Sequence, residues 1–201
     1  MIVDRLPRIG AVVLAAGASA RLGFPKQLIV YEGEPLVRRA ALAAVEAGAV
    51  PVIVVLGANA DMVAPALEGL APVRAIVNNE WSKGLASSLA AGIASVFADN
   101  RCEAVLVTLA DQPRVDAAAL RRLMAAFGAD RRIVASAYDD TVGVPAVFAR
   151  EHAEGLMRLS GDHGAGNWLR SRVAEVTRIP FGGAALDIDT SADVARLDRD
   201  R

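Results

Sequence analysis

Cysteine and histidine are scarce in this chain, and their scarcity removes several kinds of chemistry. Cys102 is the only cysteine among 201 residues, so the chain forms no intrachain disulfide and no cysteine-based metal cluster. His152 and His163 are the only histidines. The sequence therefore offers no convincing pair of residues for acid–base catalysis.

An excess of charge of either sign is also missing. The formal net charge is −1 at pH 7, which argues against nucleic acid as the main ligand. A small local basic site for one triphosphate is compatible with that balance. No apolar run approaches the length of a membrane span, and residues 1–5 show no signal-peptide core. The simplest expectation is a cytoplasmic protein that binds no membrane.

Hydrophobic residues make up 54% of the chain and charged residues 22%, which is typical of a globular protein rather than a disordered one. A chain of 201 residues is long enough for a substantial core. One domain over residues 1–201 is the expectation.

Apolar runs that favour strands alternate with helical patterns. The predicted strands are residues 9–16, 50–56, 73–77, 104–109 and 133–138, and the predicted helices are residues 36–47, 60–70, 85–97 and 115–127. This alternation predicts an α/β fold of three layers, α/β/α, with a mostly parallel Rossmann-like sheet covered on both faces.

The regular alternation of strands and helices ends after the fifth predicted strand. The pattern predicts a turn over 139–143, an extended piece over 145–148, a glycine-rich loop over 160–166, short strands over 175–180 and 184–189, and a capped last helix over 190–197.

The loop that follows the first strand carries the strongest functional signal. The apolar run ends at Gly17, small residues follow, and two cations come next, Arg21 and Lys26. Small residues let backbone N–H groups face a phosphate, while arginine grips phosphate oxygens as a fork and lysine acts as a point charge. The loop predicts binding of a nucleoside triphosphate. The alternative is an ordinary strand-to-helix turn with solvated charges.

Two common phosphate loops do not match. A Walker A loop needs a glycine, four further residues and then Gly-Lys-Ser/Thr. Here the next glycine after Gly17 is Gly23, and Lys26 does not directly follow it. A dinucleotide fingerprint needs glycine at position 19, which is Ser19.

Carboxylates follow other predicted strands. Asp111 comes directly after the fourth strand, where ligands bind in an open parallel sheet, and its oxygen suits Mg²⁺. The alternative is that Asp111 caps the next helix. Asp187 and Asp189 fall on the same side of the predicted strand 184–189, so one of them is expected to face Asp111 across the metal, with Asp189 the first choice. The alternative is a polar strand end followed by a helix cap at Thr190 or Ser191.

Two further loops contain candidate ligand groups. Residues 78–88 join the third strand to a helix that begins with small residues, so Ser87 and Ser88 either hydrogen-bond to a substrate or simply begin that helix. Residues 160–166 contain Asp162 and His163. A single histidine in such a loop is usually solvated or structural, and it is not predicted to act as a base.

Taken together, these segments resemble the molybdenum-cofactor nucleotidyltransferases, a MobA-like NTP transferase family within the GT-A-like nucleotidyltransferases, and most of all their cytidylyltransferases. The resemblance spans about residues 9 to 197. Its motifs are L-A-A-G-x-S-x-R-x-G-x-x-K at 14–26, N-x-x-x-x-x-G-x-x-x-S at 78–88, D-x-P at 111–113, G-D-x-G-A at 161–165 and D-I-D-T-x-x-D at 187–193. One departure is Val144, which stands where many cytidylyltransferases of this branch carry histidine in Gly-His-Pro.

The resemblance implies that an acceptor phosphate attacks the α-phosphorus of a nucleoside triphosphate and releases pyrophosphate. It implies CTP rather than GTP as donor, a molybdopterin-type acceptor, Mg²⁺ (or Mn²⁺) as cofactor, and a molybdenum hydroxylase as recipient of the product. The implied catalytic residues are Arg21, Lys26 and Asp111, and the implied metal ligands are Asp111, Asp189 and Asp187. The implied nucleotide-binding residues are Leu14, Ala15, Ala16, Gly17, Ser19, Arg21, Lys26, Asn79, Ser87, Ser88 and Asp111.

Four alternatives remain at this stage. They are a nucleotidyltransferase for a sugar or polyol phosphate, a guanylyltransferase of the same family, a non-catalytic nucleotide-binding regulatory module, and a dinucleotide-dependent oxidoreductase. The missing glycine at position 19 disfavours the last of these.

Overall fold

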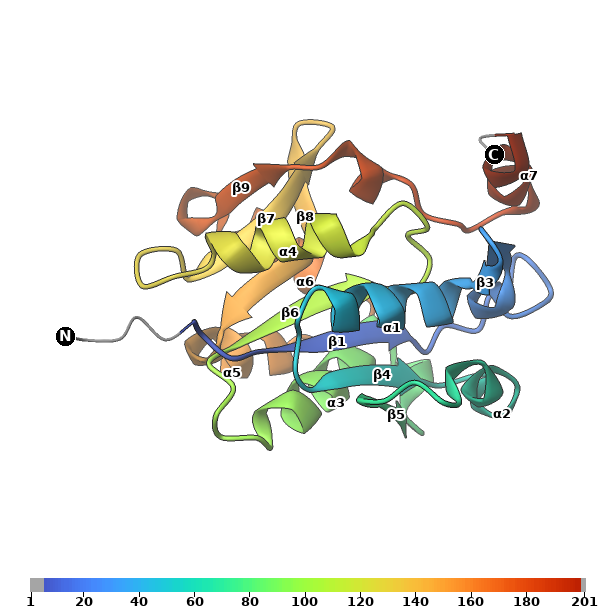
Figure 1. Cartoon of the computed structure of the whole chain (residues 1–201), viewed down its shortest axis with the longest axis horizontal. Helices are drawn as coiled ribbons and strands as arrows, with labels where there is room; N and C mark the ends of the chain where they lie inside the picture. The colour runs from blue at the N-terminus through green and yellow to red at the C-terminus, as the bar shows by residue number, and fades with distance from the viewer. Residues whose placement is uncertain (1–5, 200–201) are drawn as a thin grey trace.

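A seven-stranded sheet forms the centre of the protein (Figure 1). The structure is a computed structural model, and it describes residues 6–199. Residues 1–5, for which the sequence predicts no signal-peptide core, lie outside the described part. The strands are ordered β5-β4-β1-β6-β8-β7-β9. Their bounds are β1 Ile9–Ala15, β4 Val52–Leu56, β5 Val73–Val77, β6 Ala104–Leu109, β7 Ile133–Tyr138, β8 Thr141–Ala149 and β9 Thr177–Pro180. A two-stranded ribbon, β2 Val30–Tyr31 and β3 Glu34–Pro35, lies apart from this sheet.

Strands β5, β4, β1 and β6 run parallel, whereas β8 pairs antiparallel with both β6 and β7. Strand β9 then pairs parallel with β7. Strands β1 and β4 are buried along their whole length, which explains why they read as continuous apolar runs. The four parallel strands direct their carboxyl ends to one edge, where the loops that follow them gather.

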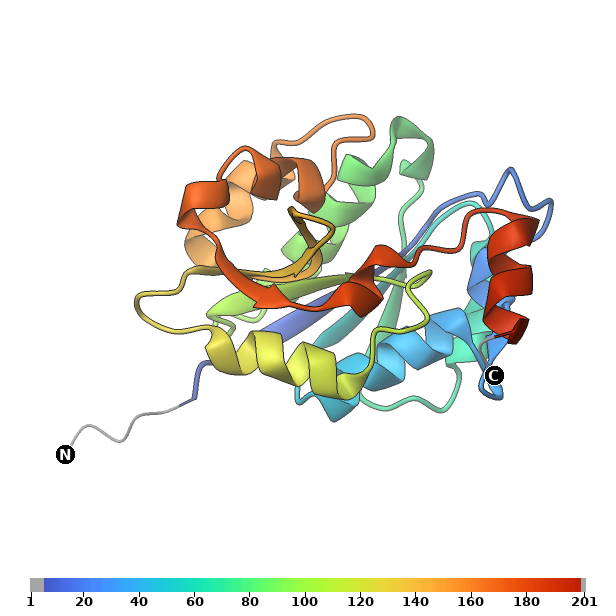
Figure 2. The same ribbon diagram turned by 90° about the horizontal axis from the view of Figure 1, so that it is seen from above.

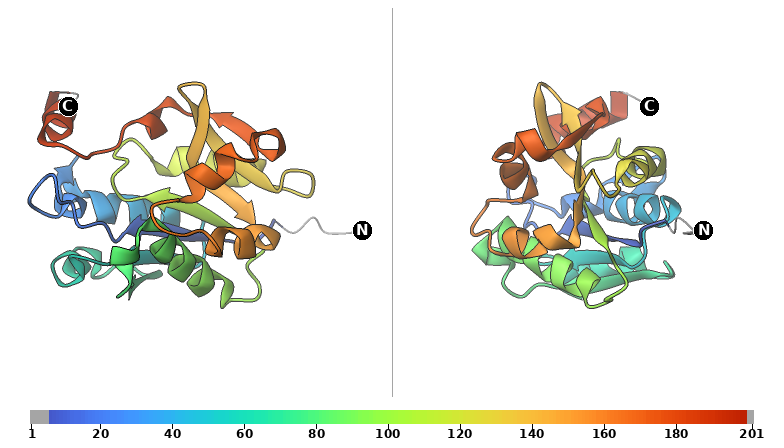
Figure 3. Two further views of the ribbon diagram at one scale, coloured as in Figure 1. Left: turned by 180° about the vertical axis from the view of Figure 1, so that it is seen from behind. Right: turned by 90° about the vertical axis from the view of Figure 1, so that its left-hand side faces the viewer.

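Helices cover both faces of the sheet, as the three-layer prediction requires (Figure 2). Helices α1 (Leu36–Glu46) and α4 (Ala117–Ala126) pack on one face, and α3 (Leu85–Phe97), α5 (Ala153–Met157) and α6 (Ala165–Arg170) pack on the other. The end-on view in Figure 3 shows the two helical layers on either side of the strands. The short α2 (Ala60–Val63) and the last helix, α7 (Ser191–Arg199), lie beyond these layers. No helix in the described chain is long and apolar enough to span a membrane.

The predicted fold class is confirmed, as are the strands and helices of the first two thirds of the chain, with one exception. The helix predicted over 60–70 is an α-helix only over Ala60–Val63 and continues as a 3-10 turn at Ala64–Leu67. The predicted turn is shorter than 139–143, because Asp139 and Asp140 alone adopt positive φ angles of 46° and 59° and β8 begins at the next residue. The predicted strand at 184–189 is wrong. A single helical turn at Gly182–Ala185 is followed by extended chain that pairs with no strand and crosses the carboxyl edge of the sheet. Helices α5 and α6 were not predicted from the sequence.

Close packing between α3 and the sheet depends on Gly92. A Cβ atom at this position would lie 2.5 Å from Val12 Cγ1 and 3.0 Å from Val55 Cγ2, and both valines are fully buried. Gly92→Ala should therefore lower the free energy of unfolding by about 1–3 kcal/mol, although alanine stabilises an unobstructed helix position by roughly 0.5–1 kcal/mol. Gly128→Ala is the control, because a Cβ atom there meets nothing within 4 Å. Chemical denaturation of both variants tests this, and an unchanged Gly92→Ala midpoint would contradict it.

Candidate functional site

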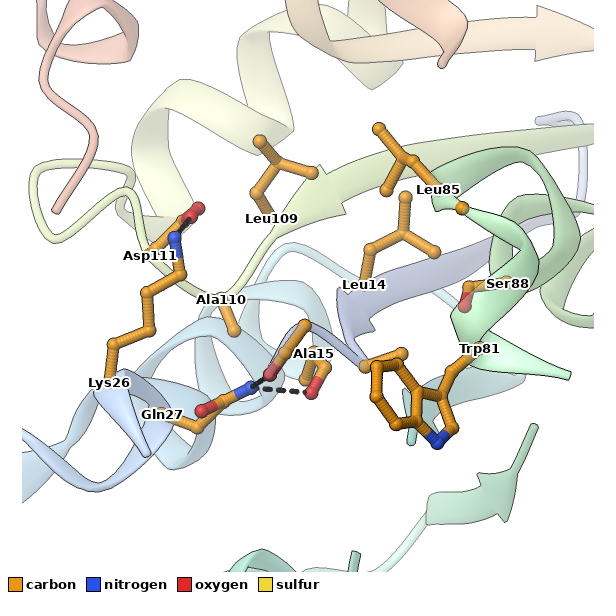
Figure 4. A pocket seen from close by; sticks show the side chains of 13 residues that line it. Leu14, Ala15, Lys26, Gln27, Trp81, Leu85, Ser88, Leu109, Ala110 and Asp111 are labelled. Atoms are coloured by element: carbon orange, nitrogen blue, oxygen red, sulfur yellow. Dashed lines mark hydrogen bonds and ion pairs between the residues drawn. The ribbon is translucent and has the colours of Figure 1, made fainter. Parts of the chain in front are cut away.

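A cavity of about 240 Å³ opens at the carboxyl ends of β1 and β6 (Figure 4). Its walls come from the ends of both strands, the first loop, and the segment that leads into α3. The lining residues are Leu14, Ala15, Ala16, Gly17, Lys26, Gln27, Trp81, Gly84, Leu85, Ser88, Leu109, Ala110 and Asp111. One end is charged and the other is mostly apolar, as Figure 4 shows.

The loop after β1 is held in place by Gln27. This side chain is 3% exposed, and its Nε2 donates to the carbonyls of Ala15 at 2.8 Å and Gly17 at 2.9 Å. Ser19 adopts a positive φ of 54°, and its Oγ accepts a hydrogen bond from the Lys26 amide at 3.0 Å. Gln27 was missed in the sequence, although a lone amide among apolar neighbours is a signal of a buried polar group that must find partners.

The ammonium group of Lys26 lies between two carboxylates. Its Nζ is 2.5 Å from Asp111 Oδ2 and 2.7 Å from Asp189 Oδ1. Burial lowers the pKa of Lys26, but the charges and hydrogen bonds of Asp111 and Asp189 outweigh it and raise the pKa above its usual value. Lys26 is therefore fully protonated near neutral pH. Arg21 approaches Asp189 at 3.9 Å, and its side chain is 77% exposed.

The predicted alternatives for the carboxylates were a helix cap or a place in the cavity, and the structure distinguishes them. Asp116, not Asp111, caps α4, because its Oδ1 accepts a hydrogen bond from the Ala119 amide at 2.7 Å. Asp111 is thus free to face the cavity, and its Oδ1 is buried without a hydrogen-bond partner in the described chain. The predicted cap at Thr190 is confirmed, because the Thr190 hydroxyl accepts from the Asp193 amide at 3.3 Å and the Asp193 carboxylate accepts in turn from the Thr190 amide at 2.8 Å, at the start of α7.

Asp187 and Asp189 lie on the crossing segment rather than on a strand. The Ile188 amide between them donates to the Asp111 carbonyl at 3.0 Å, and Ile188 is fully buried. The pKa of Asp187 is raised to about 6, mainly because the carboxylate is partly desolvated and also because Asp111 and Asp189 carry negative charge nearby. The residue as a whole is still exposed on one side. The three carboxylates thus repel one another in a small volume.

This donor set suits a hard divalent cation. Carboxylate oxygens are the preferred ligands of Mg²⁺, which is often held by one or two protein carboxylates together with substrate phosphates. Asp111 and Asp189 converge on one point, which the Lys26 ammonium occupies, and the unpartnered Asp111 oxygen adds acceptor capacity. Within residues 6–199 no three His, Cys, Asp or Glu side chains form a complete metal site. The described residues could therefore supply only part of a coordination shell.

The cavity wall formed by the segment 78–88 differs from the predicted base site at two residues, Asn79 and Ser87. Asn79 is exposed and does not line the cavity, whereas the buried Asn78 donates from Nδ2 to Ser87 Oγ at 2.9 Å and Ser88 Oγ at 3.0 Å. Ser88 lines the cavity, but Ser87 is turned inward to the carbonyls of its own loop. Trp81 also lines this wall and was missed, although an indole in a loop of small residues is a recognisable signal for a stacking surface.

The glycine-rich loop over 160–166 braces this wall. Gly84 has a φ of 102°, and a Cβ atom there would lie 2.4 Å from the Gly161 backbone. The Ala86 amide donates to the Gly161 carbonyl at 3.0 Å, so the loop fixes the start of α3. His163 is exposed, and its ring Nδ1 lies 3.2 Å from the Ser160 carbonyl, away from the cavity.

Sequence comparison gives one matching domain family and a closely similar relative. The profile of the MobA-like NTP transferase domain matches residues 11–176. Nicotine blue oxidoreductase of Paenarthrobacter nicotinovorans is 37% identical over 204 residues, which cover 96% of this chain and 97% of the relative.

Solved structures share the whole fold. Rv0371c from Mycobacterium tuberculosis H37Rv superposes with a TM-score of 0.83 at 34% identity, covering 96% of this chain and 98% of that one. A complex of Rv0371C with manganese superposes with a TM-score of 0.75 at 31% identity and the same coverage. The inositol-1-phosphate CTP transferase from T. maritima, at 20% identity and a TM-score of 0.68, covers 96% of this chain and 95% of its own and shows the fold alone.

The position of Lys26 predicts a competition between ammonium and metal. Removing the ammonium leaves Asp111 without a counter-charge and Asp189 with only the exposed Arg21 at 3.9 Å. Lys26→Ala should therefore bind Mn²⁺ in the absence of nucleotide on the order of tenfold more tightly than the unaltered protein. Lys83→Ala is the matched control, because Lys83 pairs with exposed Glu80 outside the cavity lining. Titration of Mn²⁺ followed by electron paramagnetic resonance measures the affinity. Equal Mn²⁺ affinity in all three proteins would contradict the metal assignment of this carboxylate pair.

Proposed function

Since this chain belongs to the MobA-like NTP transferase family of nucleotidyltransferases, we propose that it transfers the CMP group of CTP to a phosphate acceptor and releases pyrophosphate. The observation that carries this proposal is the meeting of Lys26, Asp111 and Asp189 at one end of a slot whose other end is mostly apolar. Charge of both signs at one end suits a triphosphate with a divalent cation, and the apolar end suits a base.

In the proposed reaction an oxygen of the acceptor phosphate forms a bond to the α-phosphorus of CTP. The bond between that phosphorus and the oxygen bridging to the β-phosphate breaks, and pyrophosphate leaves with the electron pair. The acceptor phosphate is already ionised near pH 7, so no general base is required. Catalysis then depends on positioning and on neutralisation of charge.

Residues of the first loop supply the positive charge. Lys26 is protonated, and the exposed Arg21 lies 3.9 Å from Asp189, so both are placed to pair with phosphate oxygens. The Gly17–Ser19 amides are proposed to hold the same phosphates. Asp111 and Asp189, with Asp187 beside them, are the proposed ligands of Mg²⁺ or Mn²⁺. When bound, that cation neutralises charge on the α-phosphate and the incoming anion.

The apolar end favours a small base. Ala15, Ala16 and Gly17 allow close approach of the backbone, and Trp81 forms the facing wall. A pyrimidine fits a narrow slot that excludes the larger ring of guanine by steric contact. This argument and the sequence resemblance support CTP over GTP.

A molybdopterin-type cofactor is the acceptor that the sequence resemblance favours, with a molybdenum hydroxylase as recipient of the dinucleotide product. Val144 replaces the histidine that is common in that branch, so an alternative acceptor is a sugar or polyol phosphate. The fold shared with the inositol-1-phosphate CTP transferase from T. maritima is the observation that favours this alternative.

A second candidate function is reduction with a nicotinamide cofactor. It is favoured by 37% identity over almost the whole chain to a relative that carries the name nicotine blue oxidoreductase. The first loop lacks the glycine pattern of a dinucleotide fingerprint, because Ser19 stands at its second glycine. Thermal shifts with NADH and NADPH separate the two functions, since a cofactor that binds the folded state raises the melting temperature.

The proposed reaction is tested by pyrophosphate release. With Mg²⁺ and molybdenum cofactor, CTP should give pyrophosphate and a cytidine dinucleotide identified by mass, and GTP should give much less. Asp111→Asn keeps the size of the side chain but removes its charge, so turnover should fall at least about a hundredfold while the melting temperature stays within a few degrees. A guanine product would place the protein in the guanylyl branch. Turnover of a polyol phosphate alone would support the alternative acceptor.

The base slot is tested by the two tryptophans of the chain. In Trp168→Phe the remaining fluorescence comes from Trp81, and CTP should quench it because the base stacks on the indole. In Trp81→Phe the remaining Trp168 is buried between Phe148 and His152, away from the cavity, and should not respond. Trp81→Ala should weaken CTP binding by about 1–3 kcal/mol. Quenching that survives in Trp81→Phe would show that the base binds elsewhere.

A further inference from the structure

The carboxamide of Gln27 is fully used in hydrogen bonds to the loop that follows β1 (Figure 4). Its two N–H bonds donate to the carbonyls of Ala15 at 2.8 Å and Gly17 at 2.9 Å, and its Oε1 accepts from the Ser19 hydroxyl at 3.3 Å. Only a neutral amide offers two donors and an acceptor in one planar group. Gln27 lines the cavity, yet it keeps no donor for a ligand.

The carbonyl groups of three consecutive residues, 15–17, are all held in place. Gln27 holds the first and the third, and the Ala58 amide donates to the second, that of Ala16, at 3.1 Å. The peptide units here are trans, so each carbonyl and the N–H group that follows it point in opposite directions. Fixing these carbonyls therefore fixes the directions of the N–H groups of residues 16–18.

These three N–H groups remain available to a ligand. Within residues 6–199 none of them donates a hydrogen bond to another residue. Ala16 and Gly17 line the cavity, and Gly17 and Ala18 are exposed. Successive free N–H groups form a concave site for an anion, and the direction in which two of the three point depends on Gln27.

Ser19 connects the same carboxamide to the catalytic lysine. The Ser19 hydroxyl donates to Gln27 Oε1 and accepts from the Lys26 backbone amide at 3.0 Å. Ser19 also has a φ of 54°, in the left-handed region, where the loop turns. The free N–H groups and the residue that carries the ammonium are therefore held relative to each other through Gln27.

We propose that Gln27 is a positioning residue for the triphosphate, which contacts no part of the nucleotide and acts by directing the N–H groups of residues 16–18 toward the phosphates. This proposal rests on the proposed nucleotidyl transfer and names a residue on which binding of the phosphates depends. A rotated peptide unit loses its hydrogen bond to a phosphate but keeps its apolar contacts with a base. Loss of Gln27 should therefore weaken binding of the triphosphate much more than binding of the nucleoside.

Gln27→Met tests this difference, because methionine has a similar length but makes none of the three hydrogen bonds. The probes are inorganic triphosphate, followed by calorimetry with Mg²⁺ present, and cytidine, followed by ligand-observed NMR, so that no turnover is needed. Gln27→Met should bind inorganic triphosphate about tenfold more weakly than the unaltered protein, with cytidine affinity within about twofold. A side chain that only stabilised the fold would change the melting temperature without separating the two affinities.

Gln27→Glu adds a pH profile. Its carboxylate repels the two carbonyls, so near pH 8 triphosphate binding should be at least about thirtyfold weaker than in the unaltered protein. The neutral carboxyl can donate one hydrogen bond, and burial favours this form, so its pKa is raised and the loss should shrink to about tenfold or less near pH 6. Lys26 and Asp111 line the same cavity in both proteins, so the ratio of affinities at each pH isolates the introduced carboxyl.

Asn100→Asp is the matched control, because it makes the same change from amide to acid at an exposed residue outside the cavity lining. Its triphosphate affinity should equal that of the unaltered protein at both pH values. Unchanged triphosphate affinity in Gln27→Met, or equal losses of triphosphate and cytidine, would overturn the proposal. A loss in Gln27→Glu that is the same at both pH values would also overturn it, and this comparison decides alone if Gln27→Met does not fold.

Failure of the proposed function gives a different result. Binding of inorganic triphosphate that depends on Gln27, in a protein that releases no pyrophosphate from CTP with any acceptor, would support the positioning role and contradict nucleotidyl transfer. Pyrophosphate release from CTP with triphosphate affinity unchanged in Gln27→Met would do the reverse.

Discussion

Three segments that are far apart in the sequence meet at the ammonium group of Lys26. The lysine comes from the loop after β1, Asp111 from the loop after β6, and Asp189 from the segment before α7. Two carboxylates so close together would repel each other strongly if no positive charge lay between them. The geometry of the candidate site thus depends on one charge balance, which a divalent cation and a triphosphate can take over when they bind.

Apolar packing brings the last segment to that meeting point. Ile188 and Leu197 are buried against Ile29, Tyr31 and Leu36 in a small core separate from the two layers beside the sheet. Gln112, which is 4% exposed, adds a hydrogen bond of 2.9 Å from Nε2 to the Ala184 carbonyl. The terminal helix is therefore an anchor for the crossing segment, which holds the exposed Asp189 against Lys26.

The sequence predicts the fold well because its first two thirds follow simple periodicity. Apolar strands, which are fully buried in β1 and β4 and partly exposed in the edge strand β5, alternate with amphipathic helices, so both faces of the sheet are visible as patterns. The prediction fails over 184–189, where apolar Ile188 anchors a crossing segment instead of pairing in a sheet. Alternation of residues along a chain cannot distinguish these two kinds of burial.

The candidate site was predictable where charge marks it and less so where it is apolar. Lys26 and Asp111 stand out in the sequence because a charged side chain beside a buried strand is costly unless an ion pair or a ligand compensates its charge. Gln27 and Trp81 act through partners that only the fold supplies, and the choice of Asn78 over Asn79 for the buried position depends on where β5 ends. The leucines of the cavity wall have a further consequence for how related proteins diverge. Leu14 and Leu109 are partners across β1 and β6 and both line the cavity, so a substitution at either one changes the packing of the sheet together with the shape of the cavity. Loop residues such as Trp81 line the same cavity without belonging to the sheet, so they can vary at a smaller cost in stability.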